Sequence, residues 1–307
     1  MDHQPDHAAV PARHPAFVAL AALSVATWIQ ITFGSLVRAK KAGLSCPDWP
    51  KCLGAVVPDV KVQGVIYEFG HRVFALLVSA LFAWAAYQVW RAPALRHVRK
   101  WVWALLIVLL TQIIFGALTV LIVHRGDGDP RPATWTVATH LILGNLFAAL
   151  AVVAALRVAG PGGSGPTPKW VRPLAALWTV SLLAQFVMGG NIAGNIAGLV
   201  CTEFPTCYGG IWFPSFTGLI GWQVLHRLNA YLLVLVAVDL LWCSRTDGRI
   251  RWLARALLGL VLLQATVGAI NIASYLHTAV TTTHSLLAAL LFSTTAALWV
   301  RLSESRR

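Results

Sequence analysis

Two short stretches of the chain combine residue types that can do chemistry. Glu68, His71 and Arg72 place a carboxylate, an imidazole and a guanidinium within five residues at the start of a long apolar run. A second stretch repeats the His-Arg pair 155 positions later (226 − 71), with His226 as its histidine and Gln223 in place of the glutamate. The two halves therefore share a histidine-bearing scaffold, and only the first half has a group that can ionise beside this histidine.

Four histidines lie inside apolar runs, each within a turn or two of one end of its run: His71, His140, His226 and His284. A histidine is costly inside a membrane helix and marks a functional site by default, although a lone one can equally be a hydrogen-bonded packing residue. Four histidines at equal depth in the membrane are suitable for binding a flat macrocycle from both of its faces. Haem iron takes axial imidazoles, whereas two-histidine zinc sites usually need Cys or carboxylate ligands as well. We therefore predict two haem sites, one ligated by His71 and His140 and the other by His226 and His284.

Glu68 lies three residues before His71 and hence on the same face of a helix. Its carboxylate can accept a proton or stabilise a developing cation. Alternatively, it can serve only as a hydrogen-bond acceptor that orients the histidine. The neutral Gln223 at the matching place of the second half favours a chemical role for Glu68. If Glu68 only oriented the histidine, a glutamate would be expected in both halves. We predict that Glu68 is the catalytic residue.

Three arginines stand near the same ends of these runs: Arg38, Arg72 and Arg227. Arginine forms bidentate contacts with carboxylates, so we predict that these residues contact haem propionates. The competing explanation is snorkelling, in which a long cationic side chain reaches from a helix end to the lipid headgroups.

The composition places the chain in a bilayer. Its 307 residues are 58% hydrophobic and 11% charged, and its mean hydropathy is +0.70. A helix that spans the hydrocarbon takes about 20 mainly apolar residues. We predict an all-α integral membrane protein with eight transmembrane helices, at residues 15–38, 68–90, 101–123, 135–157, 170–192, 222–243, 252–273 and 280–301.

The net charge of +13 would suggest nucleic acid binding in a soluble protein, but here its distribution among the loops indicates topology. The N-terminal arm, the loops after the second, fourth and sixth runs, and the C-terminus carry most of the arginines. By the positive-inside rule these segments face the cytoplasm. The first outer loop, with four lysines, is an exception, and the other three outer loops agree. We predict a multi-pass plasma-membrane protein with both termini in the cytoplasm, the cysteine loops outside and no nucleic acid partner.

The chain contains an internal duplication. A Cys-x5-Cys loop that begins at Cys46 has a counterpart at Cys201, again 155 positions later (201 − 46), with an acid, an aromatic residue and a proline at matching places. A Gln-x3-Gly motif also recurs in alternate runs, and we attribute it to helix packing and interhelical hydrogen bonds. We predict two pseudo-symmetric four-helix bundles, with an arm at 1–14, an N-terminal half at 15–158, a Gly/Pro linker at 159–169 and a C-terminal half at 170–307.

Four of the five cysteines form the loop pairs, Cys46 with Cys52 and Cys201 with Cys207. The charge pattern places these loops outside the cell, where an oxidising compartment permits disulfides. Structural disulfides are our prediction, and a thiol-disulfide redox role is the alternative. A zinc site is disfavoured, because no histidine lies within ligand spacing of either pair.

Together these residues resemble a known family, the haem A synthases of aerobic bacteria and mitochondria. The resemblance covers nearly the whole chain, and its distinctive parts are the segment from Gly43 to Cys52, Glu68-x-x-His71-Arg72, His140, His226-Arg227 and His284. It implies oxidation of the methyl group at C8 of haem O to the formyl group of haem A, which supplies terminal oxidases.

The resemblance also implies a division of labour between the halves. The pair of His226 and His284 corresponds to the site of a resident haem b that passes electrons, and the pair of His71 and His140 to the site of the substrate haem O. Glu68 corresponds to the catalytic glutamate of the family, and the cysteine pairs to its outer-loop disulfides. The partners implied are haem O, the bilayer, an electron donor and the haem O synthase (protohaem farnesyltransferase), and an oligomer is compatible with the pattern.

Two other functions fit part of this pattern. A bis-His membrane cytochrome would transfer electrons to a quinone without modifying haem. Such a protein usually places its haems near opposite membrane faces, whereas here all four histidines lie toward one face. A haem transporter would have no need of Glu68. We therefore predict the haem A synthase function.

Overall fold

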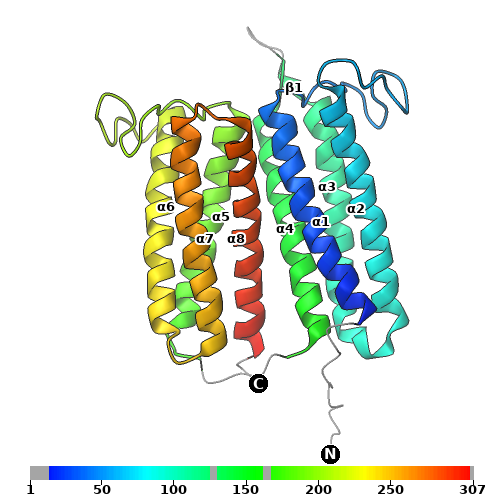
Figure 1. Ribbon diagram of the computed structural model, residues 1–307, viewed down its shortest axis with the longest axis vertical. Helices are drawn as coiled ribbons and strands as arrows, with labels where there is room; N and C mark the ends of the chain where they lie inside the picture. Colours follow the sequence, from blue (N-terminus) through cyan, green and yellow to red (C-terminus); the bar gives the residue numbers. More distant parts are fainter. Residues whose placement is uncertain (1–13, 125–129, 162–166, 305–307) are drawn as a thin grey trace, which may run out of the picture.

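The computed structural model describes residues 14–124, 130–161 and 167–304, so that residues 1–13 of the predicted arm and 162–166 of the predicted linker lie outside the described ranges. Within these ranges the chain has eight helices long and apolar enough to cross a membrane (Figure 1). They are α1 (Pro15–Ala39), α2 (Val65–Arg91), α3 (Arg99–Leu121), α4 (Thr134–Ala159), α5 (Val171–Gly194), α6 (Gly218–Cys243), α7 (Gly248–Ala273) and α8 (Thr278–Glu304). The connections include a 3-10 helix, η1 (Pro93–Val98), and an antiparallel ribbon of β1 (Val123–His124) and β2 (Arg131–Pro132). The predicted all-α membrane fold is confirmed.

The observed helices match the predicted spans to within four residues at every end, and the largest differences are the earlier starts of α6 and α7, at Gly218 and Gly248 rather than at residues 222 and 252. Helix α3 ends at Leu121 rather than at residue 123, because Val123 already pairs in the ribbon. Helix α5 begins at Val171, because Trp170 is its N-cap residue. Ala159, which we assign to the linker from the sequence, is the last residue of α4. Apolar periodicity locates a spanning helix well, but the local backbone decides its last residues.

Two local features start helices that matter for the site. Gly64 has a φ of +82°, a left-handed conformation that glycine adopts without steric cost, and it lets the first outer loop turn directly into α2. Asp247 caps α7, because its Oδ1 accepts hydrogen bonds from the backbone N–H of Arg249 and Ile250. Because α2 begins directly after Gly64, Glu68 lies within the first turn of this helix.

The helices pack around two apolar cores. One core takes its buried residues from α1 to α4 and η1, and includes Leu20, Phe82 and Phe147. The other takes them from α5 to α8 and includes the fully buried Trp178. Figure 1 shows the two groups of helices beside each other, and α1 and α4 also pack against α8 across their boundary. The division into two pseudo-symmetric bundles stays a prediction.

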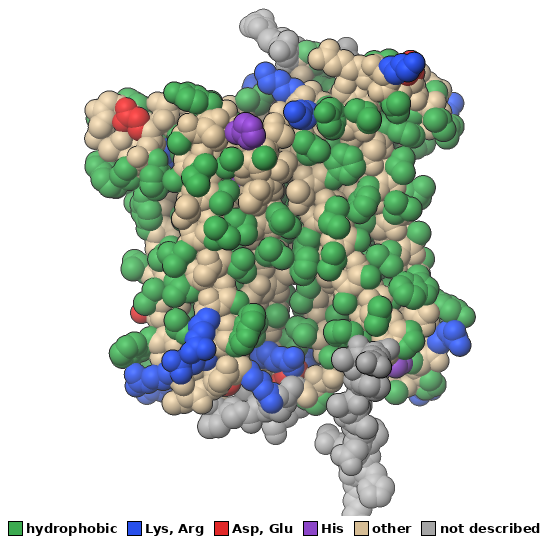
Figure 2. Space-filling model, in the orientation of Figure 1, with side chains coloured by type: hydrophobic (Ala, Val, Ile, Leu, Met, Phe, Trp, Pro, Cys, Tyr) green, Lys and Arg blue, Asp and Glu red, His purple; other side chains and the backbone are tan. Residues whose placement is uncertain are grey.

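The two ends of the molecule differ in character. Both cysteine loops lie at the same end, the upper end in Figure 1. Figure 2 shows apolar side chains over the middle of this face, with Lys and Arg side chains gathered mainly at the end opposite the cysteine loops. This layering suits a membrane-spanning protein, and the membrane face to which each end belongs stays a prediction.

Candidate functional site

Each predicted haem-ligating histidine of the first half contacts a glutamine on the preceding helix. Gln30 Nε2 on α1 lies 3.1 Å from His71 Nδ1 and 3.3 Å from His71 Nε2 on α2. Gln112 Nε2 on α3 lies 3.4 Å from His140 Nε2 on α4. From the sequence we attribute these glutamines to helix packing and interhelical hydrogen bonds, and in the structure the partners of their amide groups are the imidazole rings.

The second half repeats this arrangement and adds a further contact. Gln185 Nε2 lies 3.2 Å from His226 Nε2, and Gln264 Nε2 lies 3.1 Å from His284 Nε2. Asn229 Nδ2 donates a hydrogen bond of 2.7 Å to Gln185 Oε1. One signal in the sequence could have found the first of these pairs, because glutamine and histidine are 41 residues apart in both halves (71 − 30 and 226 − 185).

A glycine four residues after each glutamine lets the helix approach the ring closely. A Cβ atom built on these glycines would lie 3.0, 3.1, 3.3 and 3.2 Å from the Cε1 atom of the adjacent histidine, at Gly34, Gly116, Gly189 and Gly268 respectively. These separations are shorter than ordinary van der Waals contact, so any larger residue would push the ring aside. The Gln-x3-Gly motif thus positions a histidine at four places.

The histidines are near one another in pairs, His71 with His140 in the first half and His226 with His284 in the second. All four rings are half-buried. Among the described residues, no group of three or more His, Cys, Asp or Glu is placed to hold a bare metal ion. Two imidazoles instead suit haem iron, because the macrocycle supplies the other iron ligands.

Unpartnered ring nitrogens also fit a haem. His140, His226 and His284 each have a buried Nδ1 atom with no hydrogen-bond partner among the described residues. A metal-ligating histidine uses one ring nitrogen for the metal and usually the other for an orienting hydrogen bond. In these three rings a glutamine contacts one nitrogen and leaves the other available. These rings are compatible with bis-imidazole ligation of a haem iron, and the resident haem b between His226 and His284 stays a prediction.

Glu68 is buried where α2 meets the first cysteine loop, and 5% of its surface is exposed. Its Oε2 accepts a hydrogen bond of 2.9 Å from the backbone N–H of Cys46, and its Oε1 accepts one of 2.6 Å from Arg72 Nη2. The same guanidinium donates to the carbonyl oxygens of Cys46, Asp48 and Lys51, each at 2.8 Å. Both side chains therefore fasten the loop, and the contact of Arg72 with a propionate stays a prediction.

Gln223 occupies the matching place in the second half but bonds with the opposite polarity. Its Nε2 donates to the carbonyl oxygens of Ala197 and Gly198, at 3.2 and 2.9 Å. Arg227 donates to the carbonyl oxygens of Thr206 and Cys201, at 2.6 and 3.1 Å. The second loop is thus fastened without a carboxylate, and the predicted propionate contact of Arg227 also remains to be tested.

Both cysteine pairs form disulfides, Cys46 with Cys52 and Cys201 with Cys207. All four side chains are almost completely buried. The fifth cysteine, Cys243, is free and packs against the second core. Each disulfide closes a short ring over one half, as we predict from the sequence.

An acid near each disulfide organises its loop. Asp48 accepts hydrogen bonds from the backbone N–H of Leu53 and Gly54, at 2.6 and 2.9 Å. The bond from Gly54 contributes most to holding the pKa of Asp48 below its ordinary value. Glu203 has the same part in the second loop, where a hydrogen bond of 2.7 Å from Thr206 Oγ1 is the largest cause of its lowered pKa. These acids hold the backbone of the two loops.

Arg38 joins the two halves. Its Nη2 donates to the carbonyl oxygen of Ala193, near the end of α5. Ala193 is the counterpart of Arg38 in the repeat (193 − 38 = 155), so this cation is present in the first half alone. A cation at a helix C-terminus is favourable, because it lies at the negative end of the helix dipole. Contact of Arg38 with a propionate stays a prediction.

Residues 17–296 match the model of the COX15-CtaA family, described as cytochrome oxidase assembly protein. The chain belongs to this family. Among curated proteins named Heme A synthase, that of Halalkalibacterium halodurans is 26% identical over 92% of this chain and 95% of its own length. The protein of the same name from Shouchella clausii is 30% identical over 85% of this chain and 88% of its own length.

A further protein named Heme A synthase, from Shewanella oneidensis, is 25% identical over 92% of this chain and 96% of its own length. The match to the family model covers both histidine pairs and both loops, because its range of 17–296 includes all of them. Membership of the COX15-CtaA family therefore applies to the whole site and not to one half of it.

Proposed function

We propose that this protein is a haem A synthase, an oxidoreductase that converts the methyl group at C8 of haem O into the formyl group of haem A. Its membership of the COX15-CtaA family and the names of its relatives support a role in haem A biosynthesis. The observation that carries the finer proposal is an asymmetry between the halves. A buried carboxylate, Glu68, lies three residues before His71, whereas the neutral Gln223 lies three residues before His226.

In this proposal the first half binds haem O between His71 and His140. The second half holds haem b between His226 and His284, and this cofactor supplies one-electron transfer when bound. Gln30 and Gln112 orient the rings of the first pair through their amide groups. A hydrogen bond to a histidine fixes the position of its ring and tunes its basicity. A substrate site needs both, because it must bind and release haem repeatedly.

Glu68 has the reactive part in the first half. It is held at the loop end of α2 by Cys46 and Arg72, with charge-assisted hydrogen bonds to both oxygens. A fixed carboxylate beside apolar helices can stabilise positive charge that develops on the substrate, and it can take up a proton if one of these bonds is exchanged. Arg72 keeps its three carbonyl contacts with the loop during such an exchange.

The proposal includes a location and partners. Eight spanning helices place the protein in a membrane, and we assign it to the plasma membrane with the cysteine loops outside and both termini in the cytoplasm. The substrate then comes from a haem O synthase in the same bilayer. Conversion of a methyl group into a formyl group removes four electrons from haem O, so the reaction needs an oxidant that accepts them. If dioxygen is that oxidant, each hydroxylation also takes two electrons from a donor, which haem b in the second half would relay.

The test is to produce the protein in a membrane that makes haem O but no haem A, extract the haems and separate them by mass. Haem A, or its hydroxylated intermediate, is the expected product. Unchanged haem O beside a fully haem-loaded, reducible protein would contradict the proposal and would favour a bis-His electron-transfer cytochrome.

A further inference from the structure

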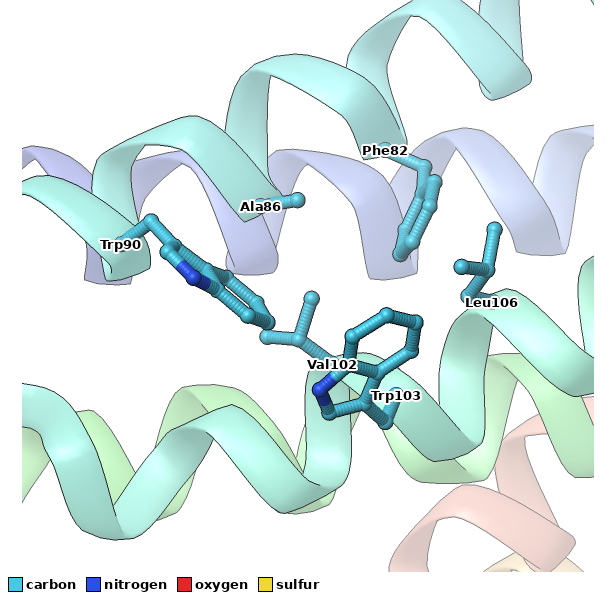
Figure 3. A pocket seen from close by; sticks show the side chains of 6 residues that line it. All are labelled: Phe82, Ala86, Trp90, Val102, Trp103 and Leu106. Atoms are coloured by element: carbon cyan, nitrogen blue, oxygen red, sulfur yellow. The ribbon is translucent and has the colours of Figure 1, made fainter.

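An apolar groove lies between α2 and α3, toward the end of these helices that η1 connects. Its volume is about 330 Å³. The residues that line this α2–α3 groove all have apolar or aromatic side chains (Figure 3): Phe82, Ala86, Trp90, Val102, Trp103 and Leu106. This volume is at the low end of the roughly 300–1,000 Å³ of small-molecule pockets, so the groove suits a hydrocarbon chain rather than a whole macrocycle.

The groove opens sideways, toward the region that the bilayer occupies. Phe82 and Val102 form its base and are 7% and 3% exposed, whereas Trp90 and Trp103 at its margin are 40% and 55% exposed. The indole rings of Trp90 and Trp103 lie edge to face (Figure 3), and their centroids are 5.8 Å apart. A ligand with a long hydrocarbon chain can therefore enter from the membrane without crossing a polar layer.

The repeat shows that this groove is a property of the first half. Ala86 and Trp103 correspond to Leu241 and Arg255 in the second half (offsets of 155 and 152). There the small residue has become large, and an aromatic residue has become a cation. Helices α2 and α3 touch little, whereas α6 and α7 pack closely. The half that we assign to the substrate is thus the half with lateral space between these helices.

The groove also lies at a suitable place relative to the first histidine pair. Phe82 is eleven residues beyond His71 on α2 (82 − 71), which is about 16 Å along the helix. The groove continues from there toward Trp90, away from the cysteine loops. A chain attached to a macrocycle held at His71 would run in this direction if it left the edge facing away from the loops.

We propose that the α2–α3 groove binds the isoprenoid tail of the haem substrate while His71 and His140 hold the macrocycle. This inference rests on the proposed function. Haem O carries a farnesyl chain of three isoprene units, and its two propionates lie on the opposite edge of the macrocycle. With the propionates toward the polar, loop-bearing end, the chain points into the apolar groove. Haem b has no such chain, which agrees with the larger and charged residues at the matching positions of the second half.

The first test uses the unaltered protein with haem b in its second half, in bilayer discs. A farnesol that carries a photoreactive diazirine is crosslinked to the protein, and the labelled peptides are identified by mass. We expect labelling of residues 82–106 that haem O suppresses and protohaem, which lacks the tail, does not. Labelling that is uniform over the membrane-facing surface, or equally suppressed by both haems, would show that ordinary lipid chains occupy the groove and would overturn the proposal.

The second test fills the groove. Ala86→Phe puts an aromatic ring into it, and Ala83→Phe makes the same change at an exposed position of α2 that does not line it. We expect the affinity for haem O, measured by its absorption change on binding, to fall about tenfold with Ala86→Phe, since two or so methylene groups lose their burial. Binding of protohaem by the first half should stay unchanged, as should both affinities in the Ala83→Phe control.

The outcomes separate this proposal from the proposed function. If the unaltered protein converts haem O, but Ala86→Phe binds it as well as the control does, the groove assignment is wrong and the function stands. If the unaltered protein leaves haem O unchanged, the function fails whatever the labelling shows. The haem b spectrum reports folding in both variants, and the labelling experiment decides the matter if Ala86→Phe does not fold.

Discussion

The second half fixes the glutamine beside its first histidine more completely than the first half does. Gln185, which contacts His226, is itself fixed through Oε1 by Asn229. The counterpart of Asn229 in the first half is Phe74 (229 − 74 = 155), and Gln30 Oε1 has no hydrogen-bond partner among the described residues. A fully satisfied polar chain is more rigid than a partly satisfied one. The difference suits a resident cofactor in the second half and an exchangeable substrate in the first.

The loop contacts differ in a complementary way. Glu68 accepts from the backbone N–H of Cys46, whereas Gln223 donates to the carbonyl oxygens of Ala197 and Gly198. A neutral amide is therefore sufficient to fasten such a loop to its helix. Fastening the loop does not require the negative charge of Glu68. This is the structural reason for assigning Glu68 a role in the reaction.

The largest expected effect comes from removing one histidine of each half. His226→Ala should abolish retention of haem b, because the iron loses an axial ligand. His71→Ala should retain haem b and lose only the binding of haem O. Haem content and the absorption spectrum of each purified variant measure this directly. Equal loss of haem b from both variants would break the distinction between the halves.

A smaller effect should follow from loosening the contact chain of the second half. Removing a residue that orients a metal ligand typically costs 10–100-fold in affinity, so we expect Asn229→Leu to weaken haem b retention roughly tenfold. Transfer of haem b to a competing apoprotein measures this retention, and the reduction potential serves as a second readout, which a purely structural role would leave unmoved.

The matched control for this change is Phe74→Leu in the first half. It should leave both the retention and the potential of haem b as they are, since Phe74 belongs to the half that we assign to the substrate. If Phe74→Leu shifted the potential as much as Asn229→Leu does, the greater rigidity of the second site would have no functional meaning.

The disulfides should contribute equally in the two halves. The bonded cysteines are six residues apart in each loop, and closing so short a ring stabilises by about 2 kcal/mol in the chain-entropy model. Replacing Cys46 and Cys52 together by Ser should lower the thermal stability of the first half by this amount without abolishing turnover. Loss of turnover at unchanged stability would instead indicate a redox role, especially if the matching change in the second loop had no such effect.

The smallest expected effect is a pH dependence of the first loop. The folded pKa of Asp48 lies below its ordinary value, so its contribution to loop order is present above the unfolded pKa and is lost as the pH falls through the folded pKa. Backbone amide exchange at Leu53 and Gly54 should therefore accelerate in acid relative to the intrinsic rate. Asp48→Asn should remove most of this dependence. An unchanged acid profile in that variant would contradict the assignment.

Much of this fold is predictable from the sequence, because spanning helices need long apolar runs and their positions follow from composition alone. The candidate ligands are also visible, since His71 and His140 are ionisable groups where a membrane chain rarely has them. The contrast between Glu68 and Gln223 needs only the repeat offset. Each of these features can be recognised from a residue type and its sequence neighbours, without knowledge of how the helices pack.

Other parts of the site depend on how helices turn toward one another, which a sequence pattern does not give. The contact of Gln30 with His71 joins two helices, and its direction follows from the packing of α1 against α2. The sequence suggests a propionate contact for Arg72, but the path of the cysteine loop brings three carbonyl oxygens to its guanidinium. The α2–α3 groove likewise exists because two neighbouring helices stay apart.

Exchange of the two loop-fastening residues shows whether Glu68 makes the first half reactive. Glu68→Gln and Gln223→Glu are each produced with a supply of haem O, and the extracted haems are separated by mass. We expect Glu68→Gln to lose haem A and its hydroxylated intermediate by about 100-fold or more while keeping haem b, and Gln223→Glu still to make haem A. Continued formation of haem A by Glu68→Gln would contradict this role of Glu68.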